Sequence, residues 1–339
     1  MALASCAVVI VITCDKPFEP VEPKDYPFYT ANLNPTSQLF VFHPISNKVD
    51  SVEIPGYAYP GLTVSADGKL LYIAQGTSVV VVETDSFNYV TELMYPQEYP
   101  VEVSPDNRLI ALTGDDLYVL RTSDYSLVFS DTSETIYGNF SSDSRDFYCS
   151  SRISQDSAYL VYNVDLSDSL FPITRKSFAG RSVVHVVPSI DETKWFLYSN
   201  VALWTSAFEV YDAINDTIIF TDILVPGSGS IAMTPDGRYV FYTSPGGTGT
   251  DPPPDNSFTI FDVGANQIDT IIKDRDFFSD SGWVRPPSIV SVSPDGKWLG
   301  MLGGQGIYGS FYLYDIEKKK LVYRKVSGTR LYEFVSLSV

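Results

Sequence analysis

A short turn signature that recurs along the chain limits the possible folds more than any other feature. It reads Val-Ser-Pro-Asp-Gly-Lys at 292–297 and Met-Thr-Pro-Asp-Gly-Arg at 233–238. Six copies occur in the 339 residues, and they begin at Val64, Val103, Phe140, Pro188, Met233 and Val292. In such a turn, proline presets φ, aspartate hydrogen-bonds its own backbone, and glycine or asparagine takes the left-handed conformation. An apolar segment precedes each copy and most are followed by an aromatic-rich one, so the pattern predicts a β-hairpin at every copy.

A second repeated segment has the form apolar-x-apolar-aromatic-polar. Seven copies, some of them loose, lie at 39–43, 79–83, 117–121, 159–163, 208–212, 258–262 and 311–315. A polar turn and a further strand follow each copy, as in Leu321–Val326. Four strands per repeat form one blade of a β-propeller. Because Asp212, Asp262 and Asp315 recur at the end of this segment, we interpret them as structural.

The two ends of the chain supply parts of one repeat. The C-terminal segment 334–338 matches 289–293 but stops before its turn, and the segment from Phe28 onward lacks a first strand. We therefore expect the last strand to pair beside Phe28–Ala31. The repeat length is about 45 residues, within the range of propeller blades. The predicted fold class is all-β: a single seven-bladed β-propeller with four antiparallel strands per blade, the first blade closed by the C-terminal strand.

The turns and strand ends together resemble those of YVTN-type and WD-like β-propellers of bacterial envelope proteins. The resemblance covers about residues 26–339. It implies the fold and no particular activity, because propellers host unrelated functions.

The N-terminal residues predict export. Ala2–Thr13 is apolar or small throughout and too short to span a membrane, which is typical of a signal-peptide h-region. It ends at Cys14, and a Pro-rich, charged stretch follows at 15–25. This order resembles a bacterial lipoprotein precursor, which implies that Cys14 becomes the lipidated first residue; a plain secretory signal and a buried first strand are the alternatives. The expected organisation is a signal or lipoprotein segment at 1–14, a tether at 15–25 and the propeller at 26–339, in the bacterial cell envelope and facing the periplasm or the surface.

Composition excludes several partners. The chain has 41 Asp and Glu against 23 Lys and Arg, a net charge of −18, so we expect no nucleic-acid partner. No apolar run of 18 residues is present, so membrane contact is expected through the lipid anchor only. With two histidines, neither a metal site nor a cofactor is expected, and the propeller is expected to be a monomeric domain. Cys149 is expected to be a free, buried hydrophobe.

The candidate binding face consists of the loops that enter the first strand of each blade. Tyrosine, tryptophan and arginine dominate the binding hot spots of interfaces. The residues of this face are Tyr57, Tyr59, Glu98, Tyr99, Tyr137, Arg181, Trp283, Arg285, Arg330 and Tyr332. On the first strands themselves we expect small or β-branched residues toward a central channel, with His185 either pointing into it or buried in the core.

These features favour a non-enzymatic binding or assembly module, anchored in the envelope, that presents a propeller face to a protein or glycan partner. No catalytic residue is assigned. The alternative is a lactonase-like envelope hydrolase with carboxylates in the channel. Clustered, unpaired carboxylates there would favour the hydrolase, and an aromatic face without them would favour binding.

Overall fold

The computed structural model describes part of the chain, and every structural statement below concerns that part. The described residues are 9–10, 27–31, 38–43, 46, 48–53, 61–75, 77–95, 101–152, 159–202, 205–224, 229–244, 257–273, 287–303, 310–326 and 336–337. Within these ranges all regular structure is β-strand, and no helix there could cross a membrane.

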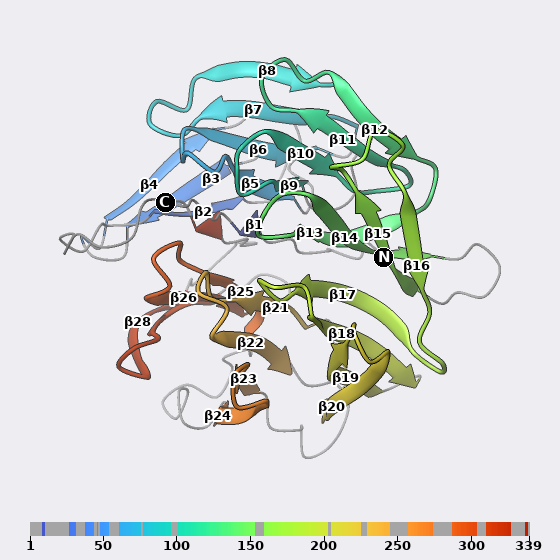
Figure 1. Ribbon diagram of the computed structural model, residues 1–339. Helices are drawn as coiled ribbons and strands as arrows, with labels where there is room; N and C mark the ends of the chain where they lie inside the picture. Colours follow the sequence, from blue (N-terminus) through green and yellow to red (C-terminus); the bar gives the residue numbers. More distant parts are fainter. Residues whose placement is uncertain are drawn as a thin grey trace.

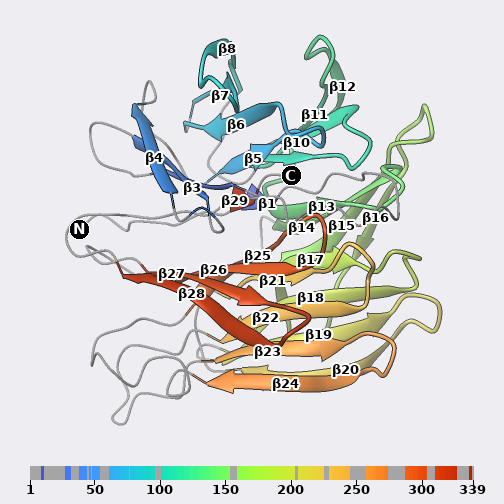
Figure 2. The same ribbon diagram turned by 90° about the vertical axis from the view of Figure 1, so that its left-hand side faces the viewer.

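Six sheets are regular blades, each made of four consecutive antiparallel strands. The first three comprise β5 (Leu62–Val64), β6 (Leu70–Ala74), β7 (Val79–Glu83) and β8 (Tyr89–Leu93); β9 (Val101–Val103), β10 (Leu109–Leu112), β11 (Leu117–Arg121) and β12 (Leu127–Asp131); and β13 (Thr135–Phe140), β14 (Asp146–Arg152), β15 (Tyr159–Asp165) and β16 (Ile173–Lys176). The next three comprise β17 (Ser182–Pro188), β18 (Lys194–Ala202), β19 (Thr205–Asp212) and β20 (Thr217–Leu224); β21 (Ile231–Met233), β22 (Tyr239–Ser244), β23 (Ser257–Asp262) and β24 (Gln267–Lys273); and β25 (Pro287–Val292), β26 (Trp298–Gly303), β27 (Ser310–Asp315) and β28 (Lys320–Val326). Figure 1 shows the first strand of each blade toward the middle of a ring and the fourth at its rim, and Figure 2 shows the same blades side by side.

The remaining sheet corrects the predicted fold class. It has five strands in the order β1-β29-β2-β3-β4, and β1 runs parallel to β29. These strands are β1 (Val9–Ile10), β29 (Ser336–Leu337), β2 (Phe28–Ala31), β3 (Gln38–His43) and β4 (Lys48–Glu53). The described chain therefore has six four-stranded blades, not seven, and the last of them, β25–β28, consists of its own strands. The prediction of seven blades is wrong because it counted the repeated five-residue segment, and the copy at 39–43 lies in β3 of this five-stranded sheet. That sheet combines strands from both chain ends and is not a blade of four consecutive strands.

The two chain ends meet in this five-stranded sheet. Phe28 pairs with Leu337 and Tyr29 with Ser336, so the C-terminal strand lies beside β2, as the repeat alignment predicts. Val9 and Ile10, which the sequence assigns to a signal segment, pair with the other edge of β29. Strand β1 also lies against β5, β9 and β25, which are first strands of three different blades. The structure thus places this N-terminal segment on the inner side of the ring.

The six predicted turns share one hydrogen-bond pattern. In the first, Ser65 Oγ donates to Asp67 Oδ1 at 2.6 Å and accepts the backbone N–H groups of Lys69 and Leu70. The same Ser/Thr-to-Asp bond recurs in the other five turns, at 2.6–2.8 Å. Gly68, with φ of 73°, adopts the left-handed conformation that this turn requires.

Three turns place a residue with a side chain at the left-handed position. One is Glu192, with φ of 57°, and the other two are Asn107 and Ser144. Asn107 has φ of 58° and Ser144 has φ of 63°. Both side chains accept a hydrogen bond from the preceding blade: Asn107 Oδ1 from Ala66 N at 3.0 Å, and Ser144 Oγ from Asp106 N at 3.1 Å. Because a non-glycine residue with positive φ is strained, we infer that these bonds between blades compensate for the strain.

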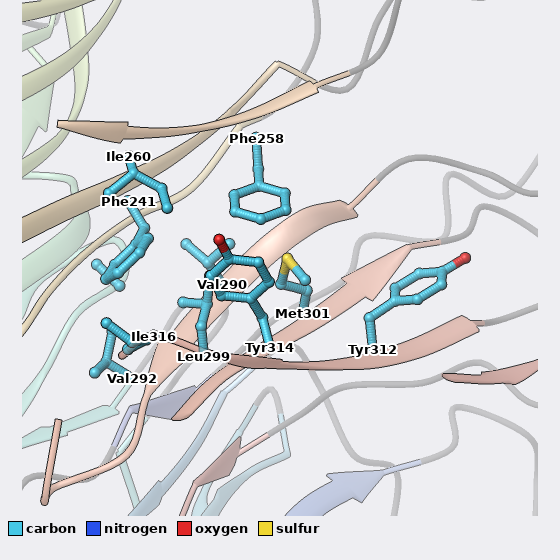
Figure 3. Close-up of a cluster of buried hydrophobic side chains, with 11 residues drawn as sticks. Phe241, Phe258, Ile260, Val290, Val292, Leu299, Met301, Tyr312, Tyr314 and Ile316 are labelled. Carbon is cyan, nitrogen blue, oxygen red and sulfur yellow. The ribbon is translucent and has the colours of Figure 1, made fainter. Parts of the chain in front are cut away.

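Apolar side chains pack between neighbouring blades. Figure 3 shows Phe241, Phe258 and Ile260 of one blade facing Leu299 and Tyr314 of the next. The rings of Phe258 and Tyr314 meet edge to face with centroids 5.3 Å apart, a favoured aromatic geometry. Aromatic and aliphatic side chains of the strands therefore hold neighbouring blades together.

Two further structural expectations are confirmed. The side chains of Asp212, Asp262 and Asp315 accept backbone N–H groups of the turn that follows each third strand, at 2.8–3.0 Å. Their recurrence thus has a local structural cause. Cys149 is a free, fully buried thiol.

Candidate functional site

Two residues of the predicted binding face belong to the described structure. They are Tyr137 on β13 and Arg181, which directly precedes β17, and both are partly exposed. These two strands begin next to each other, because they are the first strands of consecutive blades. The remaining residues of the predicted face lie outside the described residues: Tyr57, Tyr59, Glu98, Tyr99, Trp283, Arg285, Arg330 and Tyr332. The lipidation candidate Cys14 also lies outside them.

The first strands of the six blades form an inner ring. Three adjacent strands of this ring carry a polar side chain that is neither small nor β-branched. The position two residues before the turn serine or threonine holds Thr63, Glu102, Asn139, Val187, Ala232 or Ser291. Four of these are small or β-branched, but Glu102 and Asn139 are not. They lie on β9 and β13, and His185 lies on β17, so three adjacent strands carry the polar departures.

Irregular pairing turns two aromatic rings toward each other. The β13–β14 register shifts between Thr135 and Gly138, and the β17–β18 register shifts between Val183 and His185. Bulges of this kind re-aim side chains and are common near functional sites. Here Tyr137 and His185 have ring centroids 5.3 Å apart across the seam between the two blades.

Asn139 determines the tautomer of His185. Its Nδ2 donates to the backbone oxygen of Val186 at 2.8 Å and lies 3.2 Å from His185 Nε2. A carbonyl can only accept, so the amide nitrogen must face it, and the second amide N–H points at Nε2. Nε2 is therefore the acceptor, and the ring proton is on Nδ1. Burial lowers the pKa of His185 to about 4, so the ring is neutral at pH 7.

Glu102 is a carboxyl without a partner in the described part of the chain. No described group donates a hydrogen bond to it or forms an ion pair with it. The strands packed against β9 are β1, β5, β6, β10 and β13, and none of them contains a charged residue or a histidine. Burial raises the pKa of Glu102 well above its ordinary value. The side chain is nevertheless partly exposed, as expected for a group on the inner ring that solvent can still reach.

Arg181 is held by a carboxylate, Glu209, that is not among the predicted site residues. Its Nε donates to Glu209 Oε1 at 2.6 Å, and Glu209 is fully buried. Ser199 Oγ donates to Glu209 Oε2 at 2.7 Å, and Thr221 Oγ1 lies 3.4 Å from Oε1. The Arg181 side chain keeps 30% of its surface exposed. A sequence signal existed, because Glu209 is the one acidic residue at the second position of the repeated five-residue segment.

No group of three His, Cys, Asp or Glu side chains among the residues described could hold a metal ion.

Comparisons with known proteins show the fold. No family model matches the sequence, and no curated protein matches it. A hypothetical selenium-binding protein from Sulfolobus tokodaii has a similar structure, with a TM-score of 0.71 and 11% identity over 94% of both chains. The Swd1 β-propeller domain of Myceliophteria thermophila Cps50 gives 0.64 and 11% identity, over 84% of this chain and 90% of that one. Hydrazine synthase from Kuenenia stuttgartiensis gives 0.63 and 14% identity, over 96% of each.

At these identities the similarity shows a β-propeller and nothing more specific. The similar structures include an enzyme, hydrazine synthase, and a Swd1 propeller domain, so the fold does not separate catalysis from binding. No family match supports the YVTN-type or WD-like resemblance or the lipoprotein assignment.

Proposed function

We propose that this β-propeller is a binding module of the bacterial cell envelope, and that it presents the end of the inner ring where β13 and β17 begin to a protein or glycan partner. One observation carries the proposal: Arg181 is fixed at that end by the fully buried carboxylate of Glu209.

The Arg181–Glu209 ion pair is not explained by a contribution to the stability of the fold alone. Burying a carboxylate is costly, and a buried ion pair is often no more stabilising than well-packed apolar residues. What the pair does supply is a guanidinium group whose position is set before any partner arrives. An arginine held in this way loses little conformational freedom on binding, which favours affinity.

Tyr137 supplies the second anchor. It is partly exposed, and its ring rests against His185 of the neighbouring blade. A rigid aromatic side chain provides contact area at low entropic cost. Tyrosine and arginine are both enriched in interface hot spots.

A capture experiment with matched variants tests the proposal. Envelope fractions are cross-linked to the protein, and its partners are quantified for Tyr137→Ala and for the double variant Arg181→Gln/Glu209→Gln. The double variant removes both charges, so no buried carboxylate is left unpaired. Arg145→Gln is the control, since Arg145 is exposed in the turn at the opposite end of β13. We expect at least tenfold weaker capture with the two test variants and unchanged capture with the control. Equal capture by all of them would overturn the proposal.

The envelope location rests on the N-terminal sequence and has its own test. Lipidation at Cys14 would remove residues 1–13, and with them strand β1. We expect Cys14→Ser to release the protein from the membrane fraction and Cys6→Ser to leave it there. Mass spectrometry of the mature N-terminus then identifies the first residue. A mature chain that retains Val9 and Ile10 would contradict the lipid anchor.

One observation favours a second candidate, the lactonase-like hydrolase. Glu102 is a carboxyl with a raised pKa on the inner ring, the kind of group that can act as a general acid. This candidate predicts turnover of a lactone panel that is lost in Glu102→Gln. Absence of turnover by the parent protein would reject it.

A further inference from the structure

We propose that the inner ring between β9 and β17 binds a primary ammonium group of the lysine type, through Glu102, Asn139 and the ring of Tyr137. This inference rests on the proposed binding function and names the chemistry of its ligand.

The side-chain oxygen atoms of Asn139 and Glu102 accept no hydrogen bond from any described donor. Both N–H groups of the Asn139 amide are directed at protein acceptors, Val186 O and His185 Nε2. No described donor reaches its Oδ1 or either oxygen of Glu102. These two side chains occupy equivalent positions on adjacent inner strands, β9 and β13, which pack against each other. A ligand that satisfies such a site must bring donors, and an ammonium group brings three.

The charge and the aromatic ring select a cation over a neutral donor. The strands packed against β9 carry no charged residue or histidine, so no described cation there competes for Glu102. Arg181 is already paired with Glu209. Tyr137 presents an aromatic ring, which attracts cations over its face. The net charge of −18 raises the local concentration of cations around the whole protein.

Binding must also be coupled to proton release. An ammonium group stabilises the ionised form of Glu102, so a Glu102 that is protonated in the free protein loses its proton when the ligand binds. The titratable groups near it are Tyr72 on β6 and Tyr137 on β13, and next along the ring is His185. With a pKa of about 4, His185 stays neutral between pH 5 and 8. Affinity should therefore rise with pH, by up to tenfold per unit while Glu102 is protonated.

The test compares two probes that differ in a terminal ammonium group. N-acetyl-lysine N-methylamide carries the ammonium group, and N-acetyl-norleucine N-methylamide has a similar stem without it. Dissociation constants are measured by ligand-observed NMR between pH 5 and 8, for the parent protein, Glu102→Gln and the control Glu53→Gln. Glu53 is exposed on the outer strand β4. We expect the parent and the control to prefer the lysine probe at least tenfold, with affinity rising with pH, and Glu102→Gln to lose both the preference and the pH dependence.

Three results would overturn the inference: equal binding of the two probes, a pH-independent preference in the parent, or a preference that survives in Glu102→Gln. The parent's own pH series needs no variant, so the test holds even if Glu102→Gln fails to fold. If the probes fail while Tyr137→Ala still loses its partner in the capture experiment, the binding function stands and the ammonium chemistry is wrong.

Discussion

Asp146 is a described carboxyl whose environment opposes its ionisation. It begins β14, pairs with Asp165 across the β14–β15 ladder, and is partly exposed. Its pKa is raised from 3.8 to about 6, by burial first and by the charge of Glu192 second, while a hydrogen bond with Asn163 opposes the shift. Asp165 and Asp143 add further repulsion. In the folded protein the protonated form therefore persists up to about pH 6, where an ordinary aspartate is already ionised.

The sign and size of the effect follow from this shift. The stabilisation is fully present below pH 3.8 and is lost as pH rises through 6, so at pH 7.5 the ionised carboxylate opposes folding. A shift of about two units corresponds to about 3 kcal/mol for a fully buried group. Since Asp146 is partly exposed, solvent screening reduces this to about 1 kcal/mol. Asp146→Asn removes the charge and keeps an oxygen that can accept from Asn163.

Denaturant unfolding at two pH values measures the prediction. At pH 7.5 we expect Asp146→Asn to raise the free energy of unfolding by about 1 kcal/mol, and at pH 4 we expect most of that gain to disappear. Asp85→Asn, at an exposed turn position, is the control and should change neither value. A variant that is less stable at pH 7.5, or equally stabilised at both pH values, would refute the electrostatic reasoning.

Three further predictions concern the core and the ion pair. In urea unfolding, Arg181→Ala should lower the free energy of unfolding by about 3 kcal/mol, because it leaves the buried Glu209 unpaired. The double variant Arg181→Gln/Glu209→Gln should recover part of this loss. A smaller loss in the single variant than in the double variant would contradict the prediction. Gly138→Ala should lower the free energy of unfolding by about 2 kcal/mol or more, because the added Cβ would lie 2.3 Å from the Phe147 ring and 2.9 Å from Cys149 Cβ. A melting temperature equal to the parent's would show that the neighbouring side chains move to make room. Cys149 should resist a thiol-specific reagent at pH 8 until the protein unfolds, because burial raises the pKa of its thiol. Rapid labelling of Cys149 itself in the native protein would contradict its buried position.

The hairpins could be predicted from the sequence alone, because their chemistry is local. Ser65, Asp67 and Leu70 form their hydrogen bonds within six residues, and the same pattern repeats wherever the residues repeat. The aspartates after the third strands cap the next turn in the same local way. The β-propeller architecture followed from these repeats, since each unit supplies four strands that need neighbours to bury their faces.

The complete sheet that joins the chain ends depends on tertiary pairing. The repeat alignment predicts that the C-terminal strand lies beside β2, but Val9, which pairs with Ser336, belongs to no repeat. A count of turns could therefore not show that this sheet would take a fifth strand and differ from the six regular blades.

The candidate site also depended on contacts between distant residues. Arg181 was identified from its loop, but the carboxylate that fixes it is 28 residues away, and Asn139 reaches His185 across 46 residues. In the sequence Glu102 is an ordinary strand residue. Only the fold shows that no described group forms a hydrogen bond or an ion pair with it. Sequence patterns report what a residue does to its own backbone, whereas the protonation and orientation of these groups are set by the neighbours that folding brings to them.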